Sequence, residues 1–211
     1  MNGIYKSIIG IAAIILVVYL SLDIQTIEKH RTNAHTGNFN ATDYAARFWT
    51  DSLPASISNA PELIVLIKNL EENPEKAIVK WGHKLGISKT NYFMVRGSGL
   101  IENVEDEFLV VALENKTKIQ LAVDFIYGNA IRDGSGKVNI DYFLNMTDFN
   151  NVSVAINKLA KEKVVARLKK NGLRGKFVEF AGAMEIREEN IDMTTLRIIP
   201  VLAKLSDGKS K

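Results

Sequence analysis

From residue 91 onward, apolar and polar side chains alternate with a period of two in several short runs. Phe93, Val95 and Ile101 begin the series and are separated by polar or small residues. This alternation is typical of a strand with one buried face. The pattern predicts five strands, over residues 91–101, 108–113, 119–127, 177–186 and 195–205. Pro200 lacks a backbone N–H, so we expect it at an edge or a bulge of the last strand.

A helical period separates the third strand from the fourth. Val152 and Ile156 open a stripe of apolar residues at spacings of three and four, which predicts an amphipathic helix. Either Asn150 or Asn151 is expected to cap its start, because a short polar side chain there accepts a backbone N–H. The Asn-Gly pair at 171–172 is a typical C-terminal stop.

Three short helices are predicted ahead of the strands. Their expected starts lie at Asn40, Pro61 and Pro74, because asparagine is favoured as an N-cap and proline in the first turn. The third helix is expected to end at Gly86, since glycine is favoured just after a helix. His83 then falls in its last turn, where an imidazolium would interact favourably with the helix dipole.

Three strands, a helix and two strands follow one another in the order of an OB-fold, the five-stranded Greek-key barrel. A two-layer α+β sandwich built from the same elements is the alternative. We therefore expect an α+β chain whose OB-like barrel covers residues 91–205. A linker and helical appendage (31–90) precede the barrel, and a disordered tail (206–211) follows it. Residues 1–30 are expected to form a signal-anchor helix and stalk.

The N-terminal stretch favours a membrane anchor. Sixteen uncharged residues lie between Lys6 and Asp23, and as a helix they span roughly 24 Å at about 1.5 Å per residue. Lys6 and Tyr19 can reach the two interfaces and extend this span. A cleaved secretory signal is the alternative, although no small-residue cleavage site precedes Ser21, and a buried globular helix is a third. The default orientation is a single pass through the inner (cytoplasmic) membrane, with the domain on the periplasmic side.

Composition narrows the possible functions without selecting one. The 27 basic and 24 acidic residues give a formal charge of +3, which does not by itself indicate a nucleic-acid partner. The chain has no cysteine, which excludes disulfides, thiolate nucleophiles and a lipid-modified cysteine. It also lacks a Walker loop, a G-x-G-x-x-G motif and an H-E-x-x-H motif. We therefore expect no cofactor, no metal and no catalytic residue.

The pair Arg132-Asp133, at the expected end of the third strand, is the first candidate for a ligand or partner surface. In one interpretation Arg132 lies at a pocket mouth and binds an anionic or hydroxylated ligand. In the other, which the sequence favours, the two side chains satisfy carbonyl and amide groups of the surrounding turn. Asn145 and Asp148 complete the candidate surface, although we expect them first as turn and N-cap residues.

Two other function classes stay open. A hydrolase, including a carbohydrate-acting one, would use Asp124, Asp133 or Asp141 as carboxylates at the barrel mouth. A single-strand nucleic-acid-binding OB domain would need a basic groove lined with aromatic side chains. The basic stretch at 161–176 is instead expected on the outer, solvated face of a helix.

Several stretches resemble a known family. They include FNATDYAARFWTDSLPASI, GNAIRDGSGKVNIDYFLNMTDFNNVSVAIN and GKFVEFAGAMEI. The most specific residues are Gly128, Ala130, Ile131, Arg132, Asp133, Phe143, Asp148, Phe149, Asn150 and Asn157. Over roughly Phe39 to Leu205, the chain is similar to the bacterial "domain of unknown function 2291" family of predicted periplasmic lipoproteins.

The resemblance implies an extracytoplasmic location and no known enzymatic role. Because members occur beside sugar uptake transporter genes, it also implies an accessory part in solute transport. A lipoprotein needs a cysteine at its signal boundary, and this chain has none, so we expect an uncut helix to replace the lipid. The chain is accordingly predicted to be a membrane-anchored, non-catalytic binding or accessory protein. Its expected partners are the membrane and transporter subunits or another envelope protein, and not nucleic acid.

Overall fold

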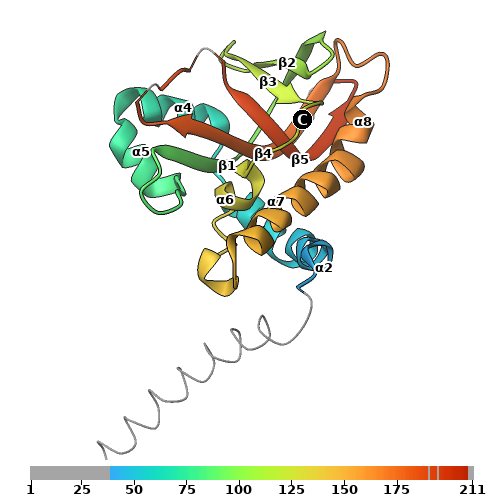
Figure 1. The fold of residues 1–211 in the computed structure, drawn as a ribbon. Helices are drawn as coiled ribbons and strands as arrows, with labels where there is room; N and C mark the ends of the chain where they lie inside the picture. Colours follow the sequence, from blue (N-terminus) through green and yellow to red (C-terminus); the bar gives the residue numbers. More distant parts are fainter. Residues whose placement is uncertain (1–38, 190, 194, 209–211) are drawn as a thin grey trace, which may run out of the picture.

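The computed structural model describes residues 39–189, 191–193 and 195–208, and its five strands close into a barrel (Figure 1). The strands are β1 (Thr90–Val104), β2 (Phe108–Leu113), β3 (Lys118–Ala122), β4 (Phe177–Arg187) and β5 (Arg197–Ser206). Their order around the barrel is β1-β2-β3-β5-β4, with β3 and β5 parallel and the other neighbours antiparallel. The predicted OB-like barrel is confirmed, and closure excludes the two-layer sandwich.

A barrel of five strands closes because β1 is long enough to serve two neighbours. Its residues from Thr90 to Leu100 pair with β4, and those from Gly99 onward pair with β2. Along β2 every second side chain is buried, as expected for a pleated strand with one face toward the core. Pro200 faces Gly182 where the β4–β5 register shifts, so the bulge predicted there is confirmed.

Helices close one end of the barrel. Ahead of β1 lie α2 (Ala41–Arg47), the π-helical turn η1 (Phe48–Ser52), α3 (Leu53–Asn59), α4 (Leu63–Glu72) and α5 (Pro74–Trp81). Between β3 and β4 lie α6 (Ala130–Gly134), the 3₁₀ turn η2 (Ile140–Tyr142), α7 (Met146–Ala160), the π-helical η3 (Lys161–Val165) and α8 (Ala166–Leu168). Short α6 packs against β1, β4 and α7, and α7 packs on α2 (Figure 1). Segments from both halves of the chain thus meet at this end.

Two predicted boundaries in the central stretch were wrong. The third strand ends at Ala122 and not near Tyr127, because the Phe125 N–H donates to the Asp124 carboxylate at 2.8 Å and Phe125 has a φ of 49°. A left-handed residue cannot continue a strand. Helix α7 starts at Met146, several residues before Asn150, because Asn145 is its N-cap. The pair Arg132-Asp133 therefore lies in α6 and not at a strand end.

The third predicted helix also ends early, and this changes the role of His83. Helix α5 stops at Trp81, after which the backbones of His83 and Tyr92 exchange hydrogen bonds of 2.8 and 2.7 Å. The imidazole packs on Gly136, where an added Cβ would lie 2.5 Å from the ring. Burial, and next the charge of Lys137, lower the pKa of His83. An imidazolium at a helix end was thus the wrong expectation.

The predicted membrane anchor, within residues 1–30, lies outside the described residues, as do residues 31–38 of the predicted linker and 209–211 of the predicted tail. Across the ranges that the structure does describe, no helix is long and apolar enough to cross a bilayer.

We expect His83 to make folding stability depend on pH. In the unfolded chain a histidine titrates near pH 6.5, whereas the folded pKa is lower. As pH falls below about 6.5, the unfolded state binds a proton that the native state does not, so stability decreases until the folded pKa is passed. Above about pH 7.5 this contribution is absent.

Urea unfolding at pH 7.5 and pH 5 should therefore show a loss of stability on acidification that is smaller in His83→Gln than in the wild type. Trp49 and Trp81 provide the fluorescence signal. An equal loss in both proteins would contradict the assignment.

Candidate functional site

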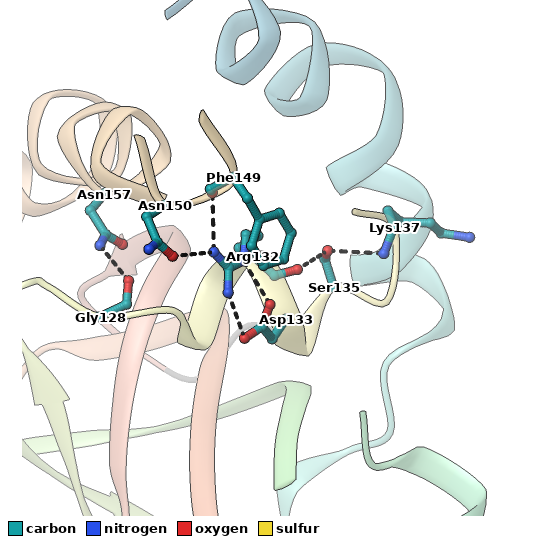
Figure 2. Close-up of polar contacts among 8 residues, drawn as sticks. All are labelled: Gly128, Arg132, Asp133, Ser135, Lys137, Phe149, Asn150 and Asn157. Atoms are coloured by element: carbon teal, nitrogen blue, oxygen red, sulfur yellow. Dashed lines mark hydrogen bonds and ion pairs between the residues drawn. The ribbon is translucent and has the colours of Figure 1, made fainter. Parts of the chain in front are cut away.

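Arg132 forms a buried centre of contacts beneath the barrel (Figure 2). Its side chain is only 1% exposed and that of Asp133 is 8% exposed. Two parallel hydrogen bonds join them, from Nε to Oδ1 at 2.7 Å and from Nη2 to Oδ2 at 3.0 Å. Nη1 donates to the Phe149 carbonyl at 3.1 Å and, at 3.4 Å, to Asn150 Oδ1. The guanidinium also lies 3.5 Å from the centre of the Phe149 ring.

These contacts link α6 to the first turns of α7 and use the hydrogen-bonding capacity of Arg132 inside the protein. A planar guanidinium suits this role, because its fixed fork matches a carboxylate and its face stacks on an aromatic ring. The guanidinium is thus satisfied inside the protein, but by Asp133 and by groups of α7 and not by carbonyl and amide groups of the surrounding turn, which the sequence had favoured. The structure does not present the guanidinium at a pocket mouth.

Asn145 and Asp148 cap α7. The Asp148 N–H donates to Asn145 Oδ1 at 2.8 Å, and Asn145 Nδ2 donates to Asp148 Oδ2 at 3.0 Å. The first bond satisfies one orphan backbone donor at the helix start, and the second joins the two side chains. Both residues thus have the capping role that the sequence favoured for them, at the end of the helix where Arg132 also binds.

The contacts of α6 extend to the N-terminal helices. Ser135 Oγ donates to the Arg132 carbonyl at 2.6 Å and accepts the Lys137 N–H at 3.2 Å. Ser56 Oγ, from α3, donates to the Ser135 carbonyl at 2.8 Å. On the other side of Arg132, Asn157 Nδ2 donates to the Gly128 carbonyl at 2.9 Å (Figure 2). The loop entering α6 is therefore fixed to α7 as well.

Ser153 carries a buried hydroxyl without a partner. The residue is 4% exposed, and its Oγ is the buried side-chain polar atom of the described residues that makes no hydrogen bond. A serine inside a helix commonly donates to the carbonyl four residues earlier, which here is that of Phe149. That oxygen already accepts Arg132 Nη1 as well as the helical N–H. The Arg132 contact thus deprives Ser153 of its usual partner.

Ser153, whose Oγ is itself buried, lines a groove between α7 and the loop after β3, which we call the α7 groove. Its volume is about 480 Å³, within the range of about 300–1,000 Å³ found for small-ligand sites. It is lined by Ile126, Tyr127, Gly128, Asn129, Asn150, Ser153, Val154, Asn157, Lys158 and Lys161. Lys161 opens η3, and π-helical turns are frequent at functional sites.

Polar and aromatic groups in the α7 groove come from different elements. Within the described residues, neither Asn150 Nδ2 nor Asn157 Oδ1 makes a hydrogen bond, so each amide keeps one group for a ligand. Tyr127 is 69% exposed and offers a ring at the rim. The sequence analysis missed Ser153 and the groove. The signal was present, because Asn150, Ser153 and Asn157 are spaced by three and four residues and share one helix face.

A larger hollow, of about 650 Å³, lies on the other side of α6. His83, Asp133 and Lys137 line it, but Asp133 is bound by Arg132. Among the described residues that line this hollow, none has a buried side-chain polar atom without a hydrogen bond. Such an atom is costly, so the one at Ser153 is the stronger indication of a site. We therefore take the smaller α7 groove as the candidate site, despite the difference in volume.

Two of the three carboxylates considered for hydrolysis, Asp124 and Asp133, have other partners. Asp124 accepts from Lys169 Nζ at 3.2 Å and from the Phe125 N–H, and these bonds, the backbone one first, lower the pKa of Asp124. Asp133 is bound by Arg132, and neither it, Asp124 nor Asp141 lines the α7 groove. In the described part of the chain, no three His, Asp or Glu side chains group as metal ligands.

Comparisons with known proteins give one family and one fold. A family model described as "Predicted periplasmic lipoprotein (DUF2291)" matches residues 12–204. The crystal structure of an OB-fold protein from Thermotoga maritima is similar with a TM-score of 0.71 and 25% sequence identity, over 81% of this chain and 100% of that chain. No curated protein matches.

Breaking the buried pair should be strongly destabilising. We expect Arg132→Met to lower the free energy of unfolding by about 3–5 kcal/mol, because Asp133 is left buried without its counter-charge. Combining Arg132→Met with Asp133→Asn should restore part of this loss. A double-mutant cycle by urea unfolding measures the coupling, and additivity within about 0.5 kcal/mol would contradict it.

Proposed function

The chain belongs to the DUF2291 family of predicted periplasmic lipoproteins, and on that premise we propose that it is a non-catalytic, extracytoplasmic binding module. Its ligand in this proposal is a small, uncharged molecule with hydroxyl groups, held in the α7 groove. The description of the family supports the extracytoplasmic location.

The buried hydroxyl of Ser153 is the observation that carries this proposal. A buried polar group without a hydrogen bond costs about 1–3 kcal/mol, and native proteins seldom keep one without a reason. A ligand hydroxyl or carbonyl in the α7 groove would supply the missing partner. Since a serine hydroxyl both donates and accepts, it suits a ligand hydroxyl, which does the same.

The other groups of the groove favour a neutral ligand with one apolar face. Its buried polar residues are Ser153 and Asn157, which carry no charge, while Asn150 and the two lysines lie on exposed positions. Tyr127 and Val154 are exposed apolar side chains at the rim. A ring with hydroxyl groups on its edge and C–H groups on its face matches this arrangement, because amides bind the edge and an aromatic ring covers the face.

Two features support a binding role over hydrolysis or nucleic-acid binding. The hydrolytic alternative lacks a carboxylate in the α7 groove. For nucleic acid, a hollow beside β1–β3 has Lys118 and Arg174 in its lining. Lys118, however, pairs with Glu102 at 2.8 Å, and no aromatic residue lines that hollow for a base to stack on.

The proposal extends to a membrane tether and a transporter partner. The uncharged stretch at 7–22 supports a single-pass anchor, and the absence of cysteine leaves no thiol for a lipid. The family resemblance supports an accessory role beside a sugar uptake transporter. In this arrangement the α7 groove would hold its ligand next to the transporter that takes it up.

Ser153→Ala should separate stability from binding. Removing the unpartnered hydroxyl should leave the ligand-free protein equally stable or more stable by about 1 kcal/mol, and yet abolish ligand binding. A panel of neutral monosaccharides and polyols, screened by thermal shift and by calorimetry, measures both effects. Ser58→Ala is the matched control, because Ser58 is exposed on α3 and bonds to its own helix.

If no member of the panel binds the wild type, the proposed ligand class is wrong. If Ser153→Ala binds as tightly as the wild type, the hydroxyl is not the contact we propose.

A photo-crosslinking residue in place of Phe125 should capture a membrane subunit of a sugar uptake transporter in intact cells. Phe125 is exposed beside the groove without lining it, so the ligand site is retained. The same residue in place of Val79, 87% exposed on α5, is the control. Equal capture from both positions, or none from either, would argue against the transporter partnership.

A further inference from the structure

Three exposed apolar side chains lie in a row just before α7. Tyr142, Leu144 and Met146 are 55%, 51% and 52% exposed. The residues between them, Phe143 and Asn145, have extended backbones, with φ and ψ of −112° and 140° and of −151° and 161°. The chain bends at Leu144 and Asn145 before α7 begins, so the three exposed apolar groups project from one short bend of the chain. We call these three side chains the apolar tip.

The apolar tip is held rigidly from behind by Phe143. The Phe143 ring packs on those of Phe39, Tyr44 and Phe149, at centroid distances of 5.4, 5.4 and 5.2 Å, in the tilted and edge-on geometries that aromatic pairs prefer. Phe149 in turn lies against the Arg132 guanidinium. The exposure of the tip is therefore a fixed feature of the fold and not the result of a loosely packed segment.

The position of Phe39 indicates what covers this tip. Phe39 is the first described residue, so the chain joins residues 1–38 beside Phe143. The uncharged stretch at 7–22 lies sixteen residues earlier, and α2 and the start of α7 lie at the same end of the domain (Figure 1). A tether attached here keeps this end of the domain near the membrane at a high effective concentration.

We propose that the apolar tip rests on the lipid surface of the membrane to which the chain is tethered. This inference relies on the tether of the proposed function but not on the ligand of the α7 groove. Residues 138–157, which include the tip, contain Asp141 and Asp148 and no lysine or arginine, so the contact does not use anionic lipid. Three apolar side chains alone bind a bilayer weakly, and a second signal, here the tether, is what makes such contacts stable.

This contact would fix the distance of the α7 groove from the bilayer. Ser153 lies seven residues along α7 from Met146, which is on the order of 10 Å at about 1.5 Å per residue. A ligand in the groove would then lie within roughly two helical turns of the lipid surface.

The absence of cysteine permits a direct test. A single cysteine replaces Leu144 in the full chain and is labelled with an environment-sensitive fluorophore. The labelled protein is then reconstituted in phosphatidylethanolamine–phosphatidylglycerol vesicles, with or without doxyl-labelled lipid. We expect a blue-shifted emission at position 144 that the doxyl lipid quenches. Val79→Cys, labelled in the same way, should show neither effect, since Val79 is on α5.

Flotation of the same vesicles reports on the tether separately. Protein that floats with the vesicles but is not quenched at position 144 would overturn the lipid contact and leave the tether intact. Protein that does not float would overturn both. An emission shift at 144 that depends on protein concentration, without lipid quenching, would show that a second copy covers the tip and would also overturn the proposal.

Discussion

The contact between the Arg132 guanidinium and its four partners is the constraint on which the helical end of this barrel depends. It joins the carboxylate of α6 to a carbonyl and an amide of α7 and to the Phe149 ring. Through Phe149 and Phe143 it also reaches Phe39 and Tyr44. A buried ion pair often adds little net stability compared with an apolar replacement. Its contribution here is geometric, because a fork of fixed directions holds α6, α7 and α2 in one arrangement.

That arrangement has a cost at Ser153, and the cost is informative. The Phe149 carbonyl already accepts from Arg132 and from the helix, and the Ser153 hydroxyl is buried and unpaired. An alanine at this position would remove the cost without disturbing the helix, since alanine has the highest helix propensity. Ser153 therefore lowers the stability of the ligand-free state at a position where a better helix former would fit. This is expected of a binding group, because residues selected for binding often cost folding stability.

The sequence predicted the barrel better than it predicted the site, and the physical reasons differ. The succession of strands along the chain and the helix between β3 and β4 follow from hydrophobic periodicity, which is a local property of the sequence. The OB-like topology expected from that succession was confirmed. The early end of β3 depends on a side chain bonding to the next backbone N–H and on a left-handed Phe125, which no periodicity encodes. Arg132 was expected to bind groups of its own turn, whereas its partners are Asp133 and groups of α7, far along the chain. Ser153 was missed because it sits within an apolar stripe, and its unusual state arises only when Arg132, seventeen residues from Phe149, occupies the shared carbonyl.

Helix α7 connects the two surfaces that the function would use. Its capped start adjoins the apolar tip and its middle lines the groove, so neither surface can rotate relative to the other without breaking the helix. The side of the domain that faces a bilayer therefore decides where the groove opens. OB-folds commonly bind ligands on the face of strands two and three, but here that region includes a neutralising Lys118–Glu102 pair. The features that suit binding are instead gathered at the helical end, where residues 1–38 join the domain. In the proposed function, the tether would keep this end nearest the bilayer, so a ligand would be presented to a membrane protein from the helical end and not from the opposite end of the barrel.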